Sequence, residues 1–261
     1  MKGVWTGCSK SFVPELGMKN WPYPRWIGHR GAGQLAPENT LAAFALGAHH
    51  GYRMFECDAR LSADGAVFLM HDDTLERTTN GHGVGSELNW AELCRLDAGG
   101  WHSGEYAGEP LCQLQTLARF CQDKGLFLNI EIKPTPGTER VTGEVVAREA
   151  ARLWAGQPVQ PLLTSFSPQA LIAACEEAPD LPRGLLLDTL QDGWFGLAQT
   201  LGCVAVVCRH ALWDASNVAR MHGAGMRCLS YTVNNEAVAQ HLIALGTDGI
   251  ITDRVDLFKP D

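Results

Sequence analysis

The feature that most constrains this chain is an alternation of two sequence patterns, repeated from Arg25 onward. Short aliphatic and β-branched runs, typical of strands, alternate with longer segments whose apolar residues recur at helical spacing. Such repeated strand–helix units predict a parallel sheet. Roughly eight units in about 240 residues match a closed (β/α)8 barrel, whereas an open doubly wound sheet usually needs fewer strands. We therefore predict an α/β fold, a TIM barrel.

The ends of the expected elements carry the residues that such ends prefer. The expected strands are 26–30, 54–60, 67–71, 126–132, 162–165, 184–187, 204–207, 227–232 and 249–252. The expected helices are 40–50, 114–121, 142–154, 168–177, 194–201, 215–222 and 236–245. Ser167-Pro168 and Asn39-Thr40 offer N-terminal capping oxygens. Glycines stand where left-handed residues end helices, at Gly51, Gly125, Gly223 and Gly246.

Two stretches depart from a plain barrel. Strands 54–60 and 67–71 are separated by a connection too short for a helix but suited to a hairpin with Asp64-Gly65 at its tip, so we expect this pair to be antiparallel. Residues 72–112 are polar, rich in Gly and Asn, and lack a clean strand pattern. Because functional loops of barrels project from the C-terminal ends of strands, we expect an inserted segment that covers the active-site mouth.

Domain organisation is predicted to be simple. We expect residues 1–20 to form a polar, mobile leader, with Met18 as an alternative start, because they lack the apolar core of a signal peptide. Residues 21–261 are expected to form a single catalytic barrel domain. The sequence contains no further boundary, internal repeat or low-complexity tract.

Charge and cysteine usage narrow the class of partner. The chain has 21 Lys and Arg against 29 Asp and Glu, a net charge of −8, which disfavours binding to nucleic acid or anionic lipid. No apolar run approaches the roughly 18 residues that a membrane span requires, so we expect no stable membrane insertion. Nine scattered cysteines without a Cys-x-x-Cys pair indicate neither a disulfide framework nor a zinc knuckle, and they favour the cytoplasm. The oligomeric state stays open.

Charged residues at inward positions of the predicted strands mark a site. Alternation puts Glu56 and Asp58 on one face of their strand, with Cys57 on the other, and it puts Glu131 and Lys133 together on another strand. Charges in a packed barrel interior cost several kcal/mol unless they are paired or bound to metal.

Two histidines are expected to reach the same site. A two-residue hairpin loop would set His71 opposite Asp58, and a four-residue loop would set it opposite Glu56. His29 and Arg30 follow the first strand and reach the same rim.

This set of side chains favours cleavage of a phosphodiester. Hard oxygen ligands from Glu56, Asp58 and Glu131 suit one divalent cation, Mg²⁺, Ca²⁺ or Mn²⁺. Arg30 and Lys133 would complete a positive cradle for the phosphate. The paired histidines would supply a general base for the attacking hydroxyl and a general acid for the leaving alkoxide.

The motifs resemble those of the glycerophosphodiester phosphodiesterase family, most closely its cytosolic bacterial members. They run from about Trp21 to Asp253 and are Gly28-His29-Arg30-Gly31, Ala36-Pro37-Glu38-Asn39-Thr40, Glu56-x-Asp58, His71-Asp72, Leu96-Asp97-Ala98-Gly99, Glu131-Ile132-Lys133, Tyr231-Thr232-Val233-Asn234 and Gly249-Ile250-Ile251-Thr252-Asp253. Tyr231 departs from the family, in which many members have Trp at this position.

The resemblance implies a TIM barrel with an inserted segment that hydrolyses deacylated phospholipid head groups to sn-glycerol 3-phosphate and an alcohol. It also implies dependence on one divalent cation. Carried over by position, it gives His29 and His71 the acid and base roles, Glu56, Asp58 and Glu131 the metal, and Arg30 and Lys133 the phosphate.

Alternative interpretations remain at this stage. A phospholipase of the same superfamily acting on intact lipids would want an apolar rim or a basic face, which the net charge of −8 disfavours. A non-catalytic barrel that binds phosphate esters would leave both histidines unexplained. Glu38-Asn39-Thr40 fits a helix cap as well as a substrate contact. Either water or the substrate's glycerol 2-hydroxyl could make the first attack.

Overall fold

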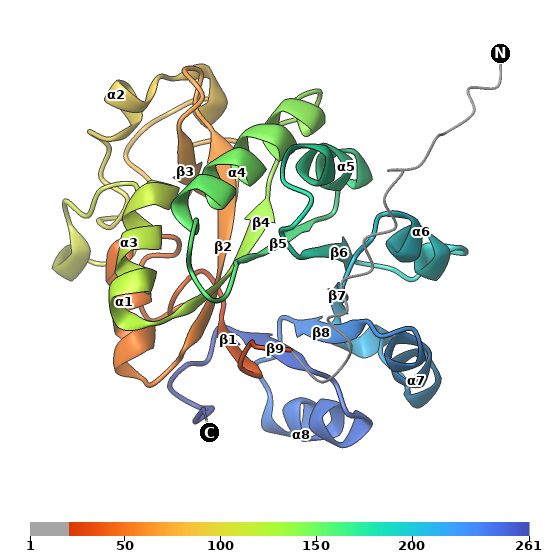
Figure 1. Ribbon diagram of the computed structural model, residues 1–261. Helices are drawn as coiled ribbons and strands as arrows, with labels where there is room; N and C mark the ends of the chain where they lie inside the picture. The colour runs from red at the N-terminus through yellow and green to blue at the C-terminus, as the bar shows by residue number, and fades with distance from the viewer. Residues whose placement is uncertain (1–20, 261) are drawn as a thin grey trace, which may run out of the picture.

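Eight parallel strands close into a barrel in the computed structural model, which describes residues 21–260. Figure 1 shows these strands in a ring with the helices around them. Closure is direct, because β1 pairs in parallel with both β2 and β9. The predicted TIM barrel is confirmed, and the predicted leader 1–20 lies outside the described residues. The barrel strands are β1 (Trp26–Gly28), β2 (Met54–Leu61), β4 (Phe127–Ile132), β5 (Leu162–Ser165), β6 (Arg183–Leu187), β7 (Ala205–Arg209), β8 (Arg227–Tyr231) and β9 (Gly249–Thr252).

Helices connect consecutive barrel strands on the outside. They are α1 (Leu41–His49), α3 (Leu114–Lys124), α4 (Glu139–Leu153), α5 (Pro168–Glu177), α6 (Trp194–Thr200), α7 (Ala215–Gly223) and α8 (Glu236–Leu245). The Thr40 and Ser167 side chains accept hydrogen bonds at the N-termini of α1 and α5, as predicted. Within residues 21–260, no helix is long and apolar enough to cross a membrane.

Three predicted helix ends were wrong. Helix α3 continues to Lys124, whereas its predicted end was residue 121. Helix α4 begins at Glu139 and not at 142, because its first turn is polar and half-buried or exposed, so apolar spacing does not mark it. Gly223 lies in the last turn of α7, and Gly225 adopts the left-handed conformation with φ +75°. Gly51, Gly125 and Gly246 have positive φ as expected.

The core has two layers, separated by the barrel wall. One apolar cluster fills the barrel interior and includes Ile27, Met54 and Leu229. A larger cluster lies between the strands and the helices and includes Phe44, Phe55 and Leu117. Cys57 belongs to this outer layer, which confirms that it points away from the barrel interior.

Strand β3 (Val67–Leu69) pairs antiparallel with β2, which confirms the hairpin. Both predicted registers were wrong, because Ala59 pairs with Leu69 and Leu61 with Val67. Ser62 and Ala66 close a three-residue loop in which Gly65 has φ +81°, a common alternative to two- and four-residue loops. In this register Asp58 lies opposite Met70, and its carbonyl accepts a hydrogen bond from the Met70 amide at 3.0 Å.

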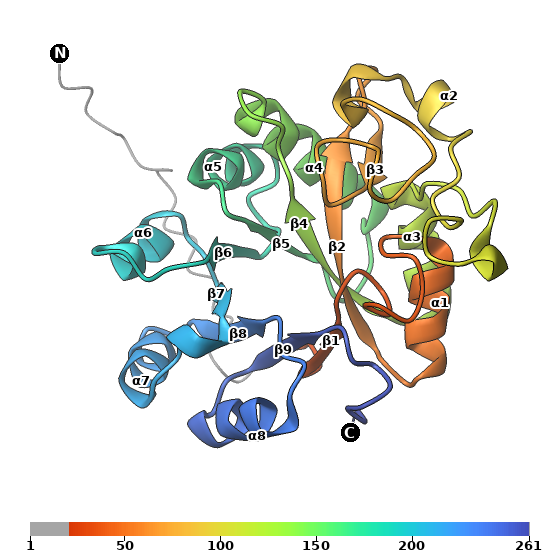
Figure 2. The ribbon, with the colours of Figure 1, turned by 180° about the vertical axis from the view of Figure 1, so that it is seen from behind.

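The segment between β3 and α3 has its own small apolar core, which includes Phe68, Leu75 and Leu93. It contains the short helix α2 (Trp90–Leu93) and two 3-10 turns, η2 (Gly85–Glu87) and η3 (Gly104–Tyr106). In Figures 1 and 2 the segment lies to one side of the barrel, next to α1 and α3. A ring nitrogen of His102 lies 3.0 Å from the Gln34 carbonyl, in the loop before α1.

Candidate active site

The seven predicted site residues meet at the C-terminal end of the barrel strands, where TIM-barrel active sites lie. Six of them line a cavity of about 180 Å³, and Asp58 lies fully buried beneath it. The cavity is lined by His29, Arg30, Glu56, His71, Asn129, Glu131, Lys133, Phe166, Leu186, Tyr231, Thr232 and Ile251. No residue of 72–112 lines this cavity, and the expected cover over its mouth stays a prediction.

Three carboxylates converge because of strand alternation and register. On β2, Glu56 and Asp58 face inward, and the parallel register with β4 sets Asp58 beside Glu131. One oxygen from each carboxylate lies within 4.8 Å of the other two. Glu56 Oε1 and Asp58 Oδ1 are buried without a hydrogen-bond partner among the described residues.

The electrostatics of this trio fit a divalent cation. Burial and repulsion from Asp58 raise the pKa of Glu131 to about 7, and burial with two neighbouring carboxylates raises the pKa of Glu56 well above its usual range. Burial would also raise the pKa of Asp58, but Arg30, Lys133 and His71 outweigh it and hold the value at about 2. Three clustered carboxylates, two of which have a buried oxygen without a hydrogen-bond partner among the described residues, are suited to Mg²⁺, Ca²⁺ or Mn²⁺.

Two cations border the carboxylates. Arg30 Nε lies 3.1 Å from Asp58 Oδ2, and Lys133 Nζ lies 3.2 Å from Glu131 Oε1. Arg30 has φ +51°, a strained conformation for a non-glycine residue, and its amide donates to Glu56 Oε2 at 3.2 Å. In this conformation the Arg30 amide faces Glu56, and the guanidinium faces Asp58.

His29 is oriented by the end of the last barrel strand. Its Nδ1 lies 2.6 Å from Asp253 Oδ1, while Nε2 lies 3.8 Å from Glu56 Oε2. Asn234 fixes Asp253 by donating to Oδ2 at 2.8 Å and accepting from the Asp253 amide at 2.9 Å. Gly33 allows this arrangement, because a Cβ at this position would lie 2.3 Å from the Asp253 backbone. With Nδ1–H donated to Asp253, the Nε2 of His29 is available to a substrate.

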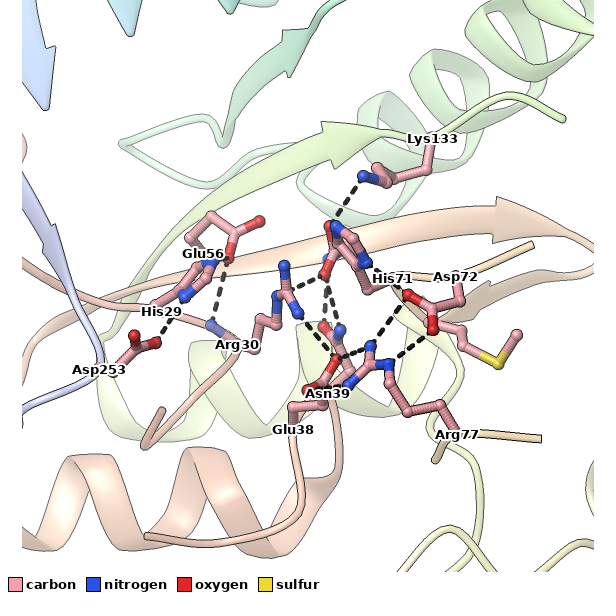
Figure 3. A network of polar contacts seen from close by, with 12 residues as sticks. His29, Arg30, Glu38, Asn39, Glu56, His71, Asp72, Arg77, Lys133 and Asp253 are labelled. Atoms are coloured by element: carbon pink, nitrogen blue, oxygen red, sulfur yellow. Dashed lines mark hydrogen bonds and ion pairs between the residues drawn. The ribbon is translucent and has the colours of Figure 1, made fainter. Parts of the chain in front are cut away.

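His71 forms a second pair of the same kind. Its Nδ1 lies 2.6 Å from Asp72 Oδ1 (Figure 3). Burial lowers the pKa of His71, and the Asp58 carboxylate opposes this effect. His71 therefore reaches the carboxylates, as expected, although neither predicted hairpin register applies.

The Glu38-Asn39-Thr40 motif divides into three separate roles. Thr40 caps α1. The Asn39 side chain, buried and with φ +60°, donates to Asp58 Oδ2 at 2.8 Å and accepts from the Asp58 amide at 3.1 Å. Glu38 accepts hydrogen bonds from Arg30 and Arg77.

Sequence reasoning did not select Asp72, Asp253, Asn39 or Arg77 as site residues. A signal existed for Asp253, because it directly follows the last strand, and barrel closure sets that strand beside the first, which carries His29. Asp72 directly follows His71 in the sequence. Nothing in the local sequence marks Arg77, whose partners Asp72 and Glu38 lie 5 and 39 positions away.

A second group with metal-ligand chemistry contains His222, Cys228 and Asp248. Its carboxylate is already engaged by His222 Nε2 at 2.9 Å, the Cys228 amide at 2.8 Å and Arg227 Nη1 at 2.8 Å. Burial raises the pKa of the Cys228 thiol. This group has one carboxylate, both of its oxygens already have partners, and its thiol is protonated. The carboxylate trio, in which Glu56 Oε1 and Asp58 Oδ1 have no hydrogen-bond partner among the described residues, is therefore the better candidate metal site.

Known proteins are similar to this chain in both sequence and fold. Residues 29–257 match the model of the glycerophosphoryl diester phosphodiesterase family. The chain belongs to this family. It is 30% identical over 235 residues to a glycerophosphodiester phosphodiesterase of Caldanaerobacter subterraneus subsp. tengcongensis, a match that covers 87% of this chain and 93% of the relative.

Solved structures of similar proteins agree with this assignment. A phosphodiesterase from Oleispira antarctica, in complex with the product sn-glycerol-3-phosphate, superposes with a TM-score of 0.82 at 33% identity, covering 88% of this chain and 93% of that one. A glycerophosphodiester phosphodiesterase from Agrobacterium tumefaciens gives a TM-score of 0.77 at 28% identity, covering 91% of this chain and 99% of that one. The predicted family is confirmed, and the protein is a phosphoric diester hydrolase.

Proposed function

We propose that the protein hydrolyses glycerophosphodiesters to sn-glycerol 3-phosphate and an alcohol, using one divalent cation held by Glu56, Asp58 and Glu131. The observation that carries the proposal is the convergence of two histidine–aspartate pairs and three carboxylates on one cavity. The product bound to the Oleispira antarctica relative supports a glycerol phosphate ligand.

Substrate binding would use the two cations at the cavity. Arg30 and Lys133 both line it, and both are held in place by carboxylates at 2.9–3.2 Å. Their guanidinium and ammonium groups would bind the non-bridging phosphate oxygens, where negative charge grows in the transition state. A bound Mg²⁺, Ca²⁺ or Mn²⁺ would supply a Lewis acid that polarises a phosphoryl oxygen.

Proton transfer would use the Nε2 atoms of His29 and His71. Each imidazole has Nδ1 fixed 2.6 Å from an aspartate oxygen, so each Nε2 can accept or donate one proton toward the cavity. One histidine takes the proton of the attacking hydroxyl as the new P–O bond forms. The other donates a proton to the departing alkoxide as the old P–O bond breaks.

We propose the substrate's own glycerol 2-hydroxyl as the first nucleophile. A tethered hydroxyl reacts with an effective molarity that can reach about 10⁵ M or more. The product of this step is a cyclic phosphate. Water then opens the ring, and the two histidines exchange their acid and base roles.

The assay is release of sn-glycerol 3-phosphate from glycerophosphocholine and glycerophosphoethanolamine with each of the three cations. Turnover is expected with at least one cation, with strong loss in Glu131→Gln and no loss in the exposed control Glu105→Gln. No release under any of these conditions would refute the proposal. Equal turnover of intact phospholipid vesicles would instead favour a phospholipase.

We also propose that residues 21–261 form one catalytic domain behind a leader, and that the protein acts in the cytoplasm, the reducing compartment that its cysteine pattern favours. Mass spectrometry of the natively expressed N-terminus and cell fractionation test these two proposals. A native chain that starts at Met1 or Lys2 would rule out Met18 as the start, and recovery outside the cytoplasm would refute the location.

A further inference from the structure

Arg77, in the segment after β3, binds two carboxylates from different parts of the chain. Its Nε donates to Asp72 Oδ2 at 2.6 Å and its Nη2 to Asp72 Oδ1 at 3.0 Å. Its Nη1 and Nη2 donate to the two oxygens of Glu38, each at 2.8 Å. Arg77 does not itself line the cavity.

Each of these carboxylates also holds a residue of the proposed machinery (Figure 3). Asp72 Oδ1 lies 2.6 Å from His71 Nδ1, and Glu38 Oε1 accepts from Arg30 Nη1 at 2.9 Å. The same oxygen that faces His71 also faces Arg77. One guanidinium therefore joins the loop that carries His71 to the loop that carries Arg30.

We infer that Arg77 is a positioning residue for the reaction: it holds Asp72, and through Asp72 the His71 imidazole, in the orientation that directs Nε2 at the phosphate. The expected effect of Arg77 on turnover rests on the proposed function. Its expected effect on His71 rests on the contacts described above.

His29 provides an example of a proposed catalytic histidine whose aspartate partner is held by a third residue. Asp253, the partner of His29, is fixed by two hydrogen bonds with Asn234. Asp72 is fixed instead by Arg77, which donates hydrogen bonds to both of its carboxylate oxygens. Arg77 and His71 also keep the pKa of Asp72 well below its usual value, so Asp72 stays an acceptor for Nδ1–H. Arg77 thus has for His71 the position that Asn234 has for His29.

Loss of a purely structural ion pair should leave turnover unchanged, and the chain contains a matched example of such a pair. Arg148 on α4 also joins two carboxylates, Glu177 at 2.8 Å and Glu144, on the outer surface away from the cavity. Exposed ion pairs of this kind contribute little to stability. Arg148→Gln therefore controls for the loss of an arginine with two carboxylate partners.

The kinetic test measures glycerophosphodiester turnover in the full chain with its cation. Arg77→Gln should lower kcat by roughly 10- to 100-fold, as expected for a misplaced catalytic group, while Arg148→Gln stays within about twofold of wild type. In an Asp72→Asn background, the Arg77→Gln change should lower kcat by less than about twofold, because both changes act on His71. An unchanged kcat, or the full loss in the Asp72→Asn background, would overturn the inference. Arg77→Lys keeps the charge with fewer donors, so its kcat should lie between those of wild type and Arg77→Gln. This variant replaces Arg77→Gln in the test if the glutamine variant does not fold.

A second readout does not depend on turnover. In ¹⁵N-histidine-labelled protein, the downfield Nδ1–H resonance of His71, assigned by its loss in His71→Ala, should shift or disappear in Arg77→Gln. The His29 resonance should stay in place, because Asn234 holds Asp253. An unchanged His71 resonance would refute the positioning role, whereas an inactive wild type with the expected shift would refute only the proposed function.

Discussion

Without the proposed divalent cation, the protein should lose stability as pH rises from about 5 to 7. The cause is Glu131, whose usual pKa of 4.5 is raised to about 7 in the fold by burial and by Asp58. Between these values the unfolded chain has ionised this carboxyl while the folded chain still carries its proton. The unfolded state then binds fewer protons, so the free energy of unfolding falls with rising pH and levels off above about 7.

The size of the effect follows from the two pKa values. A change from 4.5 to about 7 corresponds to about 3 kcal/mol, and Glu56 changes in the same direction. For a domain of this size, that corresponds to a fall in Tm of about 6–12 °C. The lowered pKa of His71 acts in the opposite direction below about pH 6.5, because the folded state then binds fewer protons than the unfolded one. The contribution of Glu131 must therefore be measured by comparing the pH dependence of stability in wild type with that in a Glu131 variant.

Thermal unfolding in chelator, at several pH values from about 5 to 8, gives the measurement. Wild type and the exposed control Glu105→Gln should lose more stability with pH than Glu131→Gln, which cannot ionise. Saturating Mg²⁺, Ca²⁺ or Mn²⁺ should reduce the loss in wild type, since the bound cation compensates the ionised carboxylates. Identical pH profiles for wild type and Glu131→Gln, or no response to any cation, would refute this reasoning.

Three further predictions concern the reaction. His29→Ala and His71→Ala should each lower kcat by about 10²–10⁴ with little change in Tm, and near-native kcat at saturating substrate would remove that residue from the mechanism. A substrate with hydrogen in place of the glycerol 2-hydroxyl should bind but not turn over, and cleavage at an undiminished rate would eliminate the cyclic phosphate. Gly33→Ala should lower both Tm and kcat, because its Cβ would lie 2.3 Å from the backbone of Asp253, the partner of His29. Wild-type Tm and kcat in this variant would show that the loop around Gly33 can move without loss of stability or activity.

Local sequence pattern was sufficient to predict which residues of β2 face inward and that the fold is a barrel. Strand alternation on β2 correctly separated Glu56 and Asp58 from Cys57, and repeated strand–helix units correctly indicated the barrel. The hairpin register depends on the number of residues in the turn. Asp64-Gly65 fits a loop of two, three or four residues, so the sequence could not select the register, although His71 reached the carboxylates.

Contacts between distant loops were the part that sequence pattern could not provide. The contact between His29 and Asp253 joins residues 224 positions apart and depends on closure of the barrel between β1 and β9. The two hydrogen bonds from Arg77 to Glu38 depend on how the segment after β3 packs beside the loop before α1. Neither arrangement has a periodicity that a single sequence displays.

The most direct test of the account is a crystal structure with sn-glycerol 3-phosphate and Mn²⁺, with the ion located by its anomalous signal. We predict one ion bound by oxygens of Glu56, Asp58 and Glu131, with the phosphate against Arg30 and Lys133 and the Nε2 atoms of His29 and His71 on either side of it. An ion or a phosphate bound elsewhere in the molecule, with this cavity empty at saturating ligand, would contradict the account.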